Sequence, residues 1–169
     1  MKNALIFLLS LALFSCDDGD LQIETINFDD SDIQYCGSSV TTGTTLFFKL
    51  VGSEALILTL ESGALKNEAS EGEVSYALSS NTKITYRIFS DDVSEDYFCD
   101  TIPVTDPTVI EEIEATSGYV LITTVQKVED DVTSYEHSIR LSEITLINNS
   151  NDQRITDLSI NDFGTVTTE

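Results

Sequence analysis

Apolar and polar residues alternate with a period of two along most of the chain after residue 20. Because successive side chains of an extended strand point to opposite faces, this period predicts β-strands, and no long stretch has the period of an amphipathic helix. The alternation is clearest over residues 21–28, 45–51, 55–61, 82–90, 119–128 and 133–147, is weaker over 74–78, and returns through Ile155, Leu158, Ile160 and Phe163.

This number of short strands, separated by polar turns, predicts an all-β fold. We expect a single antiparallel β-sandwich of about eight to ten strands over residues 21–169, with a closed β-barrel as the alternative. The length of the chain suits one domain with one hydrophobic core.

The register of the first clear hairpin can be anticipated. Gly52-Ser53 separates strands 45–51 and 55–61 and is typical of a hairpin turn. A two-residue loop would pair Leu50 with Ala55 and put the leucines of the two strands on opposite faces. We therefore expect an odd-length loop or a bulge that brings these leucines to one face.

The two longest strands, 119–128 and 133–147, are separated by an acidic turn. The apolar phase of the second strand shifts after Leu141, which predicts a bulge near Ser142-Glu143.

Residues 106–118 fit two structures. Asp106-Pro107 is typical of a helix start, and a short helix near 107–116 could end at Gly118. The same residues also alternate, and Ser117-Gly118 could turn a strand back into 119–128. We favour this hairpin, because a sheet context overrides weak helix propensity.

The first 15 residues depart from the strand pattern. Lys2 precedes a largely apolar run from Ala4 to Phe14. A membrane-spanning helix needs about 20 apolar residues, so this shorter run predicts a signal peptide over residues 1–15 rather than an anchor helix.

The stretch Leu13-Phe14-Ser15-Cys16 resembles the lipobox of bacterial lipoproteins. The resemblance implies that Cys16 is acylated, with palmitate among the expected chains, and becomes the mature N-terminus. More than one acyl chain gives stable anchorage to a membrane that the protein does not span. An ordinary signal peptide with an incidental cysteine is the alternative.

The next residues, Asp17-Asp18-Gly19-Asp20, resemble the acidic export tag of surface lipoproteins of Bacteroidetes, including flavobacterial lipoproteins of unassigned function. The resemblance implies that residues 16–20 are a lipidated, acidic tether and that Asp17, Asp18 and Asp20 direct the protein to the outer face of the outer membrane. In enteric bacteria an aspartate directly after the cysteine implies retention in the inner membrane, so a location facing the periplasm stays open. A solvated acidic linker is the third interpretation.

The chain has three cysteines, and lipidation of Cys16 leaves Cys36 and Cys99. In an oxidising compartment these two predict a disulfide. It would close a loop of about 60 residues, for which the chain-entropy model gives about 4 kcal/mol. Two buried free thiols are the alternative.

The formal net charge is −22 at pH 7. This charge opposes binding to nucleic acid or to an anionic membrane surface. One acidic loop has the spacing to offer several oxygen ligands to calcium, through Asp91, Asp92, Glu95 and Asp96. The loop contains no EF-hand motif, so a solvated turn is the alternative, and we expect no other cofactor.

The sequence favours no catalytic residue. His137 is the only histidine and lies within a predicted strand, and the chain contains no G-x-S-x-G motif to supply a nucleophile for it. Glycoside hydrolysis by paired carboxylates is disfavoured because the chain has no tryptophan to line a sugar cleft.

These features favour a lipid-anchored, non-enzymatic binding or structural module at the surface of the outer membrane. Its expected partners are the membrane, through the lipid, and a surface protein or a glycan. Aromatic residues at strand ends and loops are candidates for a glycan-binding face: Tyr35, Tyr97, Phe98, Tyr119 and Tyr135. A calcium-dependent glycan-binding module is the first alternative, and a small hydrolase is the second.

Overall fold

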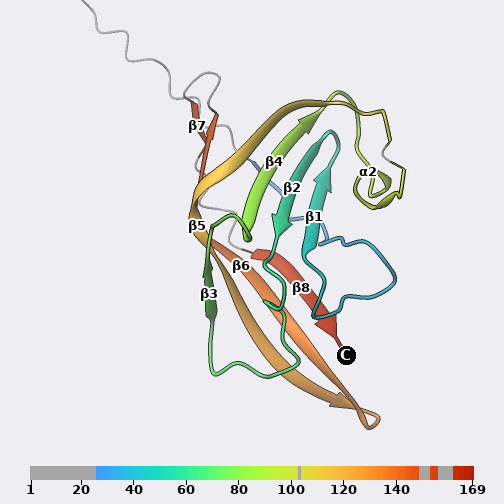
Figure 1. Cartoon of the computed structure of the whole chain (residues 1–169), viewed down its shortest axis with the longest axis vertical. Coiled ribbons are helices and arrows are strands. Elements are labelled where there is room, and N and C mark those ends of the chain that lie inside the picture. Colours follow the sequence, from blue (N-terminus) through green and yellow to red (C-terminus); the bar gives the residue numbers. More distant parts are fainter. Residues whose placement is uncertain (1–25, 103, 149–152, 156–161) are drawn as a thin grey trace, which may run out of the picture.

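The computed structural model describes residues 26–102, 104–148, 153–155 and 162–169, the side chains of 153–155 excepted. The described residues form eight strands and one helix of a single turn (Figure 1). In chain order these are β1 (Leu46–Val51), β2 (Glu54–Thr59), β3 (Val74–Ala77), β4 (Lys83–Phe89), α2 (Asp96–Cys99), β5 (Val109–Glu129), β6 (Val132–Asn148), β7 (Gln153–Ile155) and β8 (Asp162–Thr168). The predicted all-β class is confirmed.

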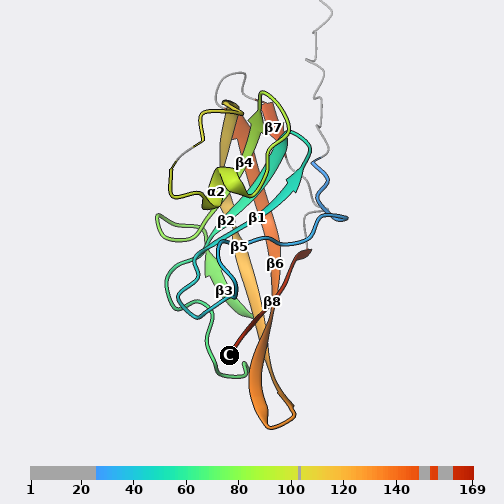
Figure 2. The ribbon, with the colours of Figure 1, turned by 90° about the vertical axis from the view of Figure 1, so that its right-hand side faces the viewer.

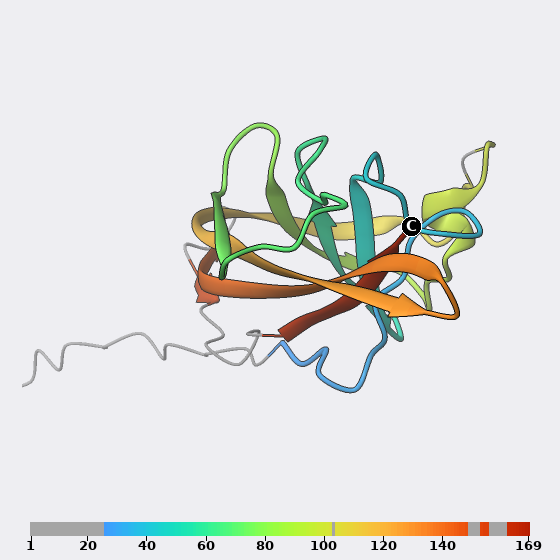
Figure 3. The same cartoon turned by 90° about the horizontal axis from the view of Figure 1, so that it is seen from below.

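All the strands belong to one antiparallel sheet. Its order is β1-β2-β4-β5-β6-β7, with β3 added beside β5 and β8 beside β6. The first part of β5 pairs with β4, and the rest pairs with β3 and β6. Because β5 runs through both parts of the sheet, the sheet curls into a half-barrel whose two halves face each other (Figure 3). The two layers of a sandwich are thus present, joined through β5.

The main core lies between these two halves. It includes buried side chains from β1, β2, β4, β5, β6 and β8: Phe47, Leu56, Leu58, Ile84, Tyr86, Ile113, Val120, Ile122, Ile139, Leu141, Phe163 and Val166. The segment before β1 adds Ile26 and Phe28, which are 1% and 3% exposed. These two residues are not in a strand, so the strand expected over 21–28 is not found at 26–28, and its other residues lie outside the described part of the chain.

Gly118 marks the bend in β5. Its φ is +136°, and a Cβ there would lie 2.6 Å from Cδ1 of Ile144. Residues 109–129 nevertheless form one strand, so both the helix near 107–116 and the hairpin at Ser117-Gly118 are wrong. Glycine lets the strand bend against β6 at this point instead of turning back on itself.

The partner strand bends at the same level. The pairing of β5 with β6 shifts register on both sides of Ser117, and Glu143 has a φ of +57°. The bulge predicted near Ser142-Glu143 is therefore confirmed. Beyond the bend, β5 and β6 continue as a hairpin that projects past the other strands (Figure 2), and Asp130-Asp131 forms its turn, as predicted.

The β1–β2 hairpin differs from expectation. Its turn has two residues, and Leu50 pairs with Ala55 and Phe48 with Ile57. The leucines of the two strands therefore face opposite sides, and the expected odd-length loop is wrong. The reason is that both faces of this hairpin are buried, so neither strand has to show a polar face to water.

One face of the hairpin belongs to the main core, and the other is covered by α2 and the loop before it. The buried residues on this second face form what we call the outer cluster: Phe48, Ala55, Ile57, Phe89 and Val93. The rings of Phe48 and Phe98 stack with centroids 4.4 Å apart, and Phe89 and Tyr97 meet edge to face at 4.8 Å. Such pairs add stability beyond the area that they bury.

Candidate binding site

A cavity of about 540 Å³ lies where the half-barrel is not closed. We call it the seam cavity. It is lined by residues 29 and 31–33, by Lys49 of β1 and by residues 162–165 of β8. Strands β1 and β8 are not paired with each other, so this cavity lies at the junction of two sheet edges and a loop.

Lys49 is the unusual residue of this cavity. It lies two residues after Phe47 on β1, so it points to the same face of the strand as that core residue. Only 4% of Lys49 is exposed. Within the described residues, its ammonium group has no ion pair or hydrogen-bond partner. Burial lowers the pKa of Lys49, while the charges of Asp162, Asp29 and Asp32 act in the opposite direction.

The loop that carries two of these aspartates is held in place by hydrogen bonds. Ser31 Oγ donates to the carbonyl of Leu50 at 2.9 Å, and the Ser31 amide donates to the carbonyl of Phe28 at 3.1 Å. Ile33 packs against Gly164 of β8, where a Cβ would lie 3.0 Å from Cβ of Ile33. These contacts within the protein fix the rim of the seam cavity.

The chemistry of the cavity is that of a polar binding site. A lysine ammonium offers hydrogen-bond donors only, and an ionised aspartate offers acceptors only. A ligand that carries both acceptors and donors could satisfy both kinds of group at once.

His137 occupies a different part of the molecule and is fully buried. Its Nδ1 lies 2.9 Å from Oγ1 of Thr124, and its Nε2 lies 2.9 Å from Oγ1 of Thr168. The Thr168 hydroxyl donates its proton to Oδ1 of Asn67 at 2.6 Å, so it accepts from Nε2–H, and Nδ1 accepts from Thr124. Burial lowers the pKa of His137, which favours this neutral form.

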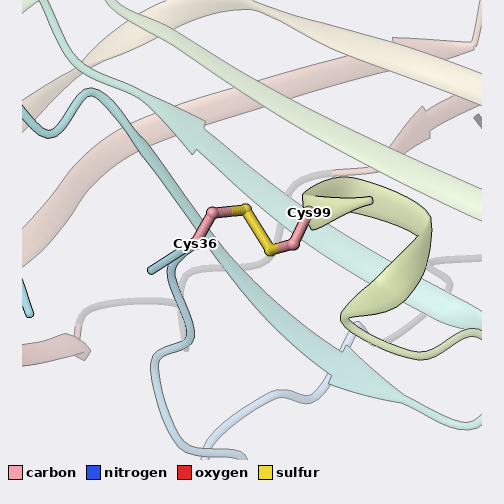
Figure 4. Close-up of a disulfide and its surroundings, with 2 residues drawn as sticks. All are labelled: Cys36 and Cys99. Atoms are coloured by element: carbon pink, nitrogen blue, oxygen red, sulfur yellow. A yellow bond between two sulfur atoms is a disulfide. The ribbon is translucent and has the colours of Figure 1, made fainter. Parts of the chain in front are cut away.

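The predicted disulfide joins Cys36 and Cys99, with their Cα atoms 5.2 Å apart (Figure 4). It ties the segment before β1 to the end of α2. Both cysteines pack against the outer cluster, so the disulfide helps to hold the cover of that cluster in place.

The acidic loop before α2 is held by hydrogen bonds. Asp91 Oδ1 accepts from the amide of Asp92 at 2.8 Å, and the Val93 amide donates to the carbonyl of Gly52 at 3.0 Å. Among the described residues, no three His, Cys, Asp or Glu side chains lie close enough together to hold a metal ion. The set Asp91, Asp92, Glu95 and Asp96 therefore receives no support from the structure.

The candidate glycan-binding aromatics do not form one face. Tyr97 and Phe98 pack against the outer cluster, and Tyr35 packs against the main core. Tyr119 is 42% exposed on β5, and Tyr135 is partly buried on β6.

The residues of the predicted tether lie outside the described part of the chain, Cys16, Asp17, Asp18 and Asp20 included. In the part that is described, no helix has the length and apolar character needed to cross a membrane. Comparison with protein-family models, with curated proteins and with solved structures finds no match to the chain.

Lys49 was not among the residues that the sequence indicated. A signal for it exists: it is the one charged residue in the strand sequence LFFKLV. A charge within an otherwise apolar strand predicts either an exposed edge or a buried charge with a role, and only the three-dimensional arrangement decides between them.

Proposed function

We propose that this protein is a lipid-anchored module of the bacterial outer membrane that faces the cell exterior and binds a partner or ligand without catalysing a reaction. The lipobox-like stretch ending at Cys16 supports the lipid anchor. The acidic residues after it support a location on the outer face of the membrane, which we call the address. More than one acyl chain on Cys16 would hold the domain at the membrane stably.

The observation that carries the proposal is the pairing of Cys36 with Cys99. Disulfides form and persist in oxidising compartments outside the cytoplasm. The pairing uses two of the three cysteines in the chain and leaves Cys16, at the end of the apolar run, as the remaining thiol. This division supports export followed by lipidation.

The environment of His137 supports a binding role over a catalytic one. Each ring nitrogen already lies within hydrogen-bond distance of a threonine hydroxyl in the protein interior. A general base needs one nitrogen free to reach a substrate proton.

Metabolic labelling with an alkyne fatty acid tests the anchor. We expect label on the wild-type chain, no label on Cys16→Ser, and full label on the control Cys36→Ser, because lipidation does not depend on the disulfide. Equal label on wild type and Cys16→Ser, or none on either, would contradict lipidation at Cys16.

Protease shaving of intact cells tests the address, with a periplasmic protein as the control for leakage. We expect loss of the wild-type protein and protection of the variant Asp17→Asn/Asp18→Asn/Asp20→Asn. Protection of the wild type would contradict surface exposure.

A further inference from the structure

We propose that the seam cavity binds a neutral carbohydrate, with Lys49 donating hydrogen bonds to ligand oxygens and with Asp29, Asp32 and Asp162 accepting hydrogen bonds from its hydroxyl groups. The inference deepens the proposed function and rests on it, since a surface module is where such a ligand would be met.

Burial of Lys49 has a cost in free energy. A charged amine removed from water without a partner is unfavourable. Only 4% of the residue is exposed, and the described part of the chain leaves the donors of Lys49 without a direct partner. A ligand oxygen in the seam cavity would satisfy them.

The charges around the cavity select a neutral ligand. An anion would meet the carboxylates of Asp29, Asp32 and Asp162 and a chain of net charge −22. A metal cation has no lone pair with which to accept hydrogen bonds from the Lys49 ammonium, and that ammonium would repel it. A sugar hydroxyl both donates and accepts, so one neutral molecule can serve the lysine and the aspartates together.

The size and stiffness of the cavity agree with a small ligand. Its volume of about 540 Å³ lies within the usual range of ligand pockets, about 300–1,000 Å³. The Ser31–Leu50 hydrogen bond and the contact of Ile33 with Gly164 hold its rim, so little ordering is needed on binding.

Saturation-transfer difference NMR on the full lipidated chain in detergent tests the proposal. The neutral probes are D-glucose, D-galactose, D-mannose and N-acetyl-D-glucosamine, each at millimolar concentration. D-glucuronate is the matched anionic probe. We expect saturation of at least one neutral sugar, and weaker saturation of D-glucuronate.

Two variants locate the binding. Lys49→Met keeps the length of the side chain and removes the donors, and we expect its affinity to fall about tenfold or more, as for loss of a hydrogen bond to a charged group. Lys127→Met changes an exposed lysine on β5 and should bind as the wild type does. Asp162→Asn, at an exposed position, provides a second test in case Lys49→Met does not fold, and its affinity should also fall.

The proposal is overturned if none of the four neutral sugars is saturated, if D-glucuronate is saturated most strongly, or if both Lys49→Met and Asp162→Asn bind as the wild type does. These results come from purified protein. They are therefore separate from the shaving and labelling results, which concern the anchor and the address.

Discussion

The two faces of β1 differ in what covers them. On one face, Phe48 lies under α2 and a disulfide, in a cluster closed by aromatic rings. On the other face, Phe47 enters the main core but Lys49, two residues later, ends in the seam cavity. The first face is sealed by packing and a covalent link, and the second keeps a buried amine beside an opening. Stability and binding are thus assigned to opposite sides of one strand.

Substitution of Phe48, on the sealed face, should cost the most stability. Phe48→Ala should lower the free energy of unfolding by about 3–5 kcal/mol. The substitution removes a fully buried ring and its stacking contact with Phe98. Urea denaturation of the full chain in detergent measures this loss. Val51→Ala, at a residue that is 45% exposed on the same strand, is the control and should change stability by less than about 0.5 kcal/mol. A loss of similar size in both variants would show that the outer cluster is not a specific packing unit.

The Cys36–Cys99 disulfide should make the next largest contribution to stability. The double variant Cys36→Ala/Cys99→Ala removes a link across 63 residues and should lower the free energy of unfolding by about 2–4 kcal/mol. The same denaturation measurement applies. Carbohydrate binding at the seam cavity should persist below the unfolding transition, since the disulfide lies on the opposite face of β1. Loss of binding in a folded double variant would show that the two faces of β1 do not act independently.

His137, unlike Lys49, is a buried polar residue whose hydrogen-bond partners are described, Thr124 and Thr168. Burial lowers its pKa in the folded state, so on acidification the unfolded chain takes up a proton at about pH 6.5 before the folded chain does. Stability should therefore fall as the pH decreases below about 6.5, by up to about 1.4 kcal/mol for each pH unit until the folded pKa is reached.

Urea midpoints at pH 7 and pH 5 measure this effect, and subtraction of the same pH difference in His137→Gln removes the contribution of the carboxylates. An equal pH dependence in wild type and variant would mean that His137 is not held neutral in the fold.

The smallest effect belongs to Lys49, and it has the opposite sign. Lys49→Met should raise the free energy of unfolding by about 1 kcal/mol at pH 7, because it removes a buried charge for which residues 26–102, 104–148 and 162–169 supply no direct partner. Burial lowers the pKa of Lys49, so the folded protein loses this proton first as the pH rises, and the advantage of the variant should shrink at alkaline pH. Thermal unfolding at pH 7 and pH 9 measures both points. A variant less stable than the wild type at pH 7 would mean that Lys49 has a strong partner in the fold.

The strand pattern predicted much of this fold. Period-two alternation located the strands, the phase shift after Leu141 predicted the bulge, and Cys36 and Cys99 predicted the link. Several local expectations were wrong, and two of them show what alternation cannot express. Gly118 bends a strand instead of ending it, and both faces of the β1–β2 hairpin are covered, so the leucines need not share one face.

The candidate site was harder to predict than the fold. Asp29, Asp32 and Asp162 line the same cavity as Lys49 only because β8 returns beside the loop that precedes β1. These residues come from segments that are far apart in the sequence, so the sequence does not indicate that they line one cavity. The acidic loop at 91–96 was the more visible candidate, because its charges are adjacent in sequence, yet they do not converge on one point.

The most direct test of the account is the acid–base behaviour of the Lys49 amine. Trace acetylation of the full chain with acetic anhydride over a range of pH, read by mass spectrometry, gives a titration curve for Lys49. We predict that the pKa of Lys49 lies below the ordinary lysine value of 10.5, and that the amine reacts more slowly when a binding neutral sugar fills the cavity. A pKa of Lys49 at or above 10.5 would contradict this description of the site, because it would mean that an aspartate already neutralises the amine.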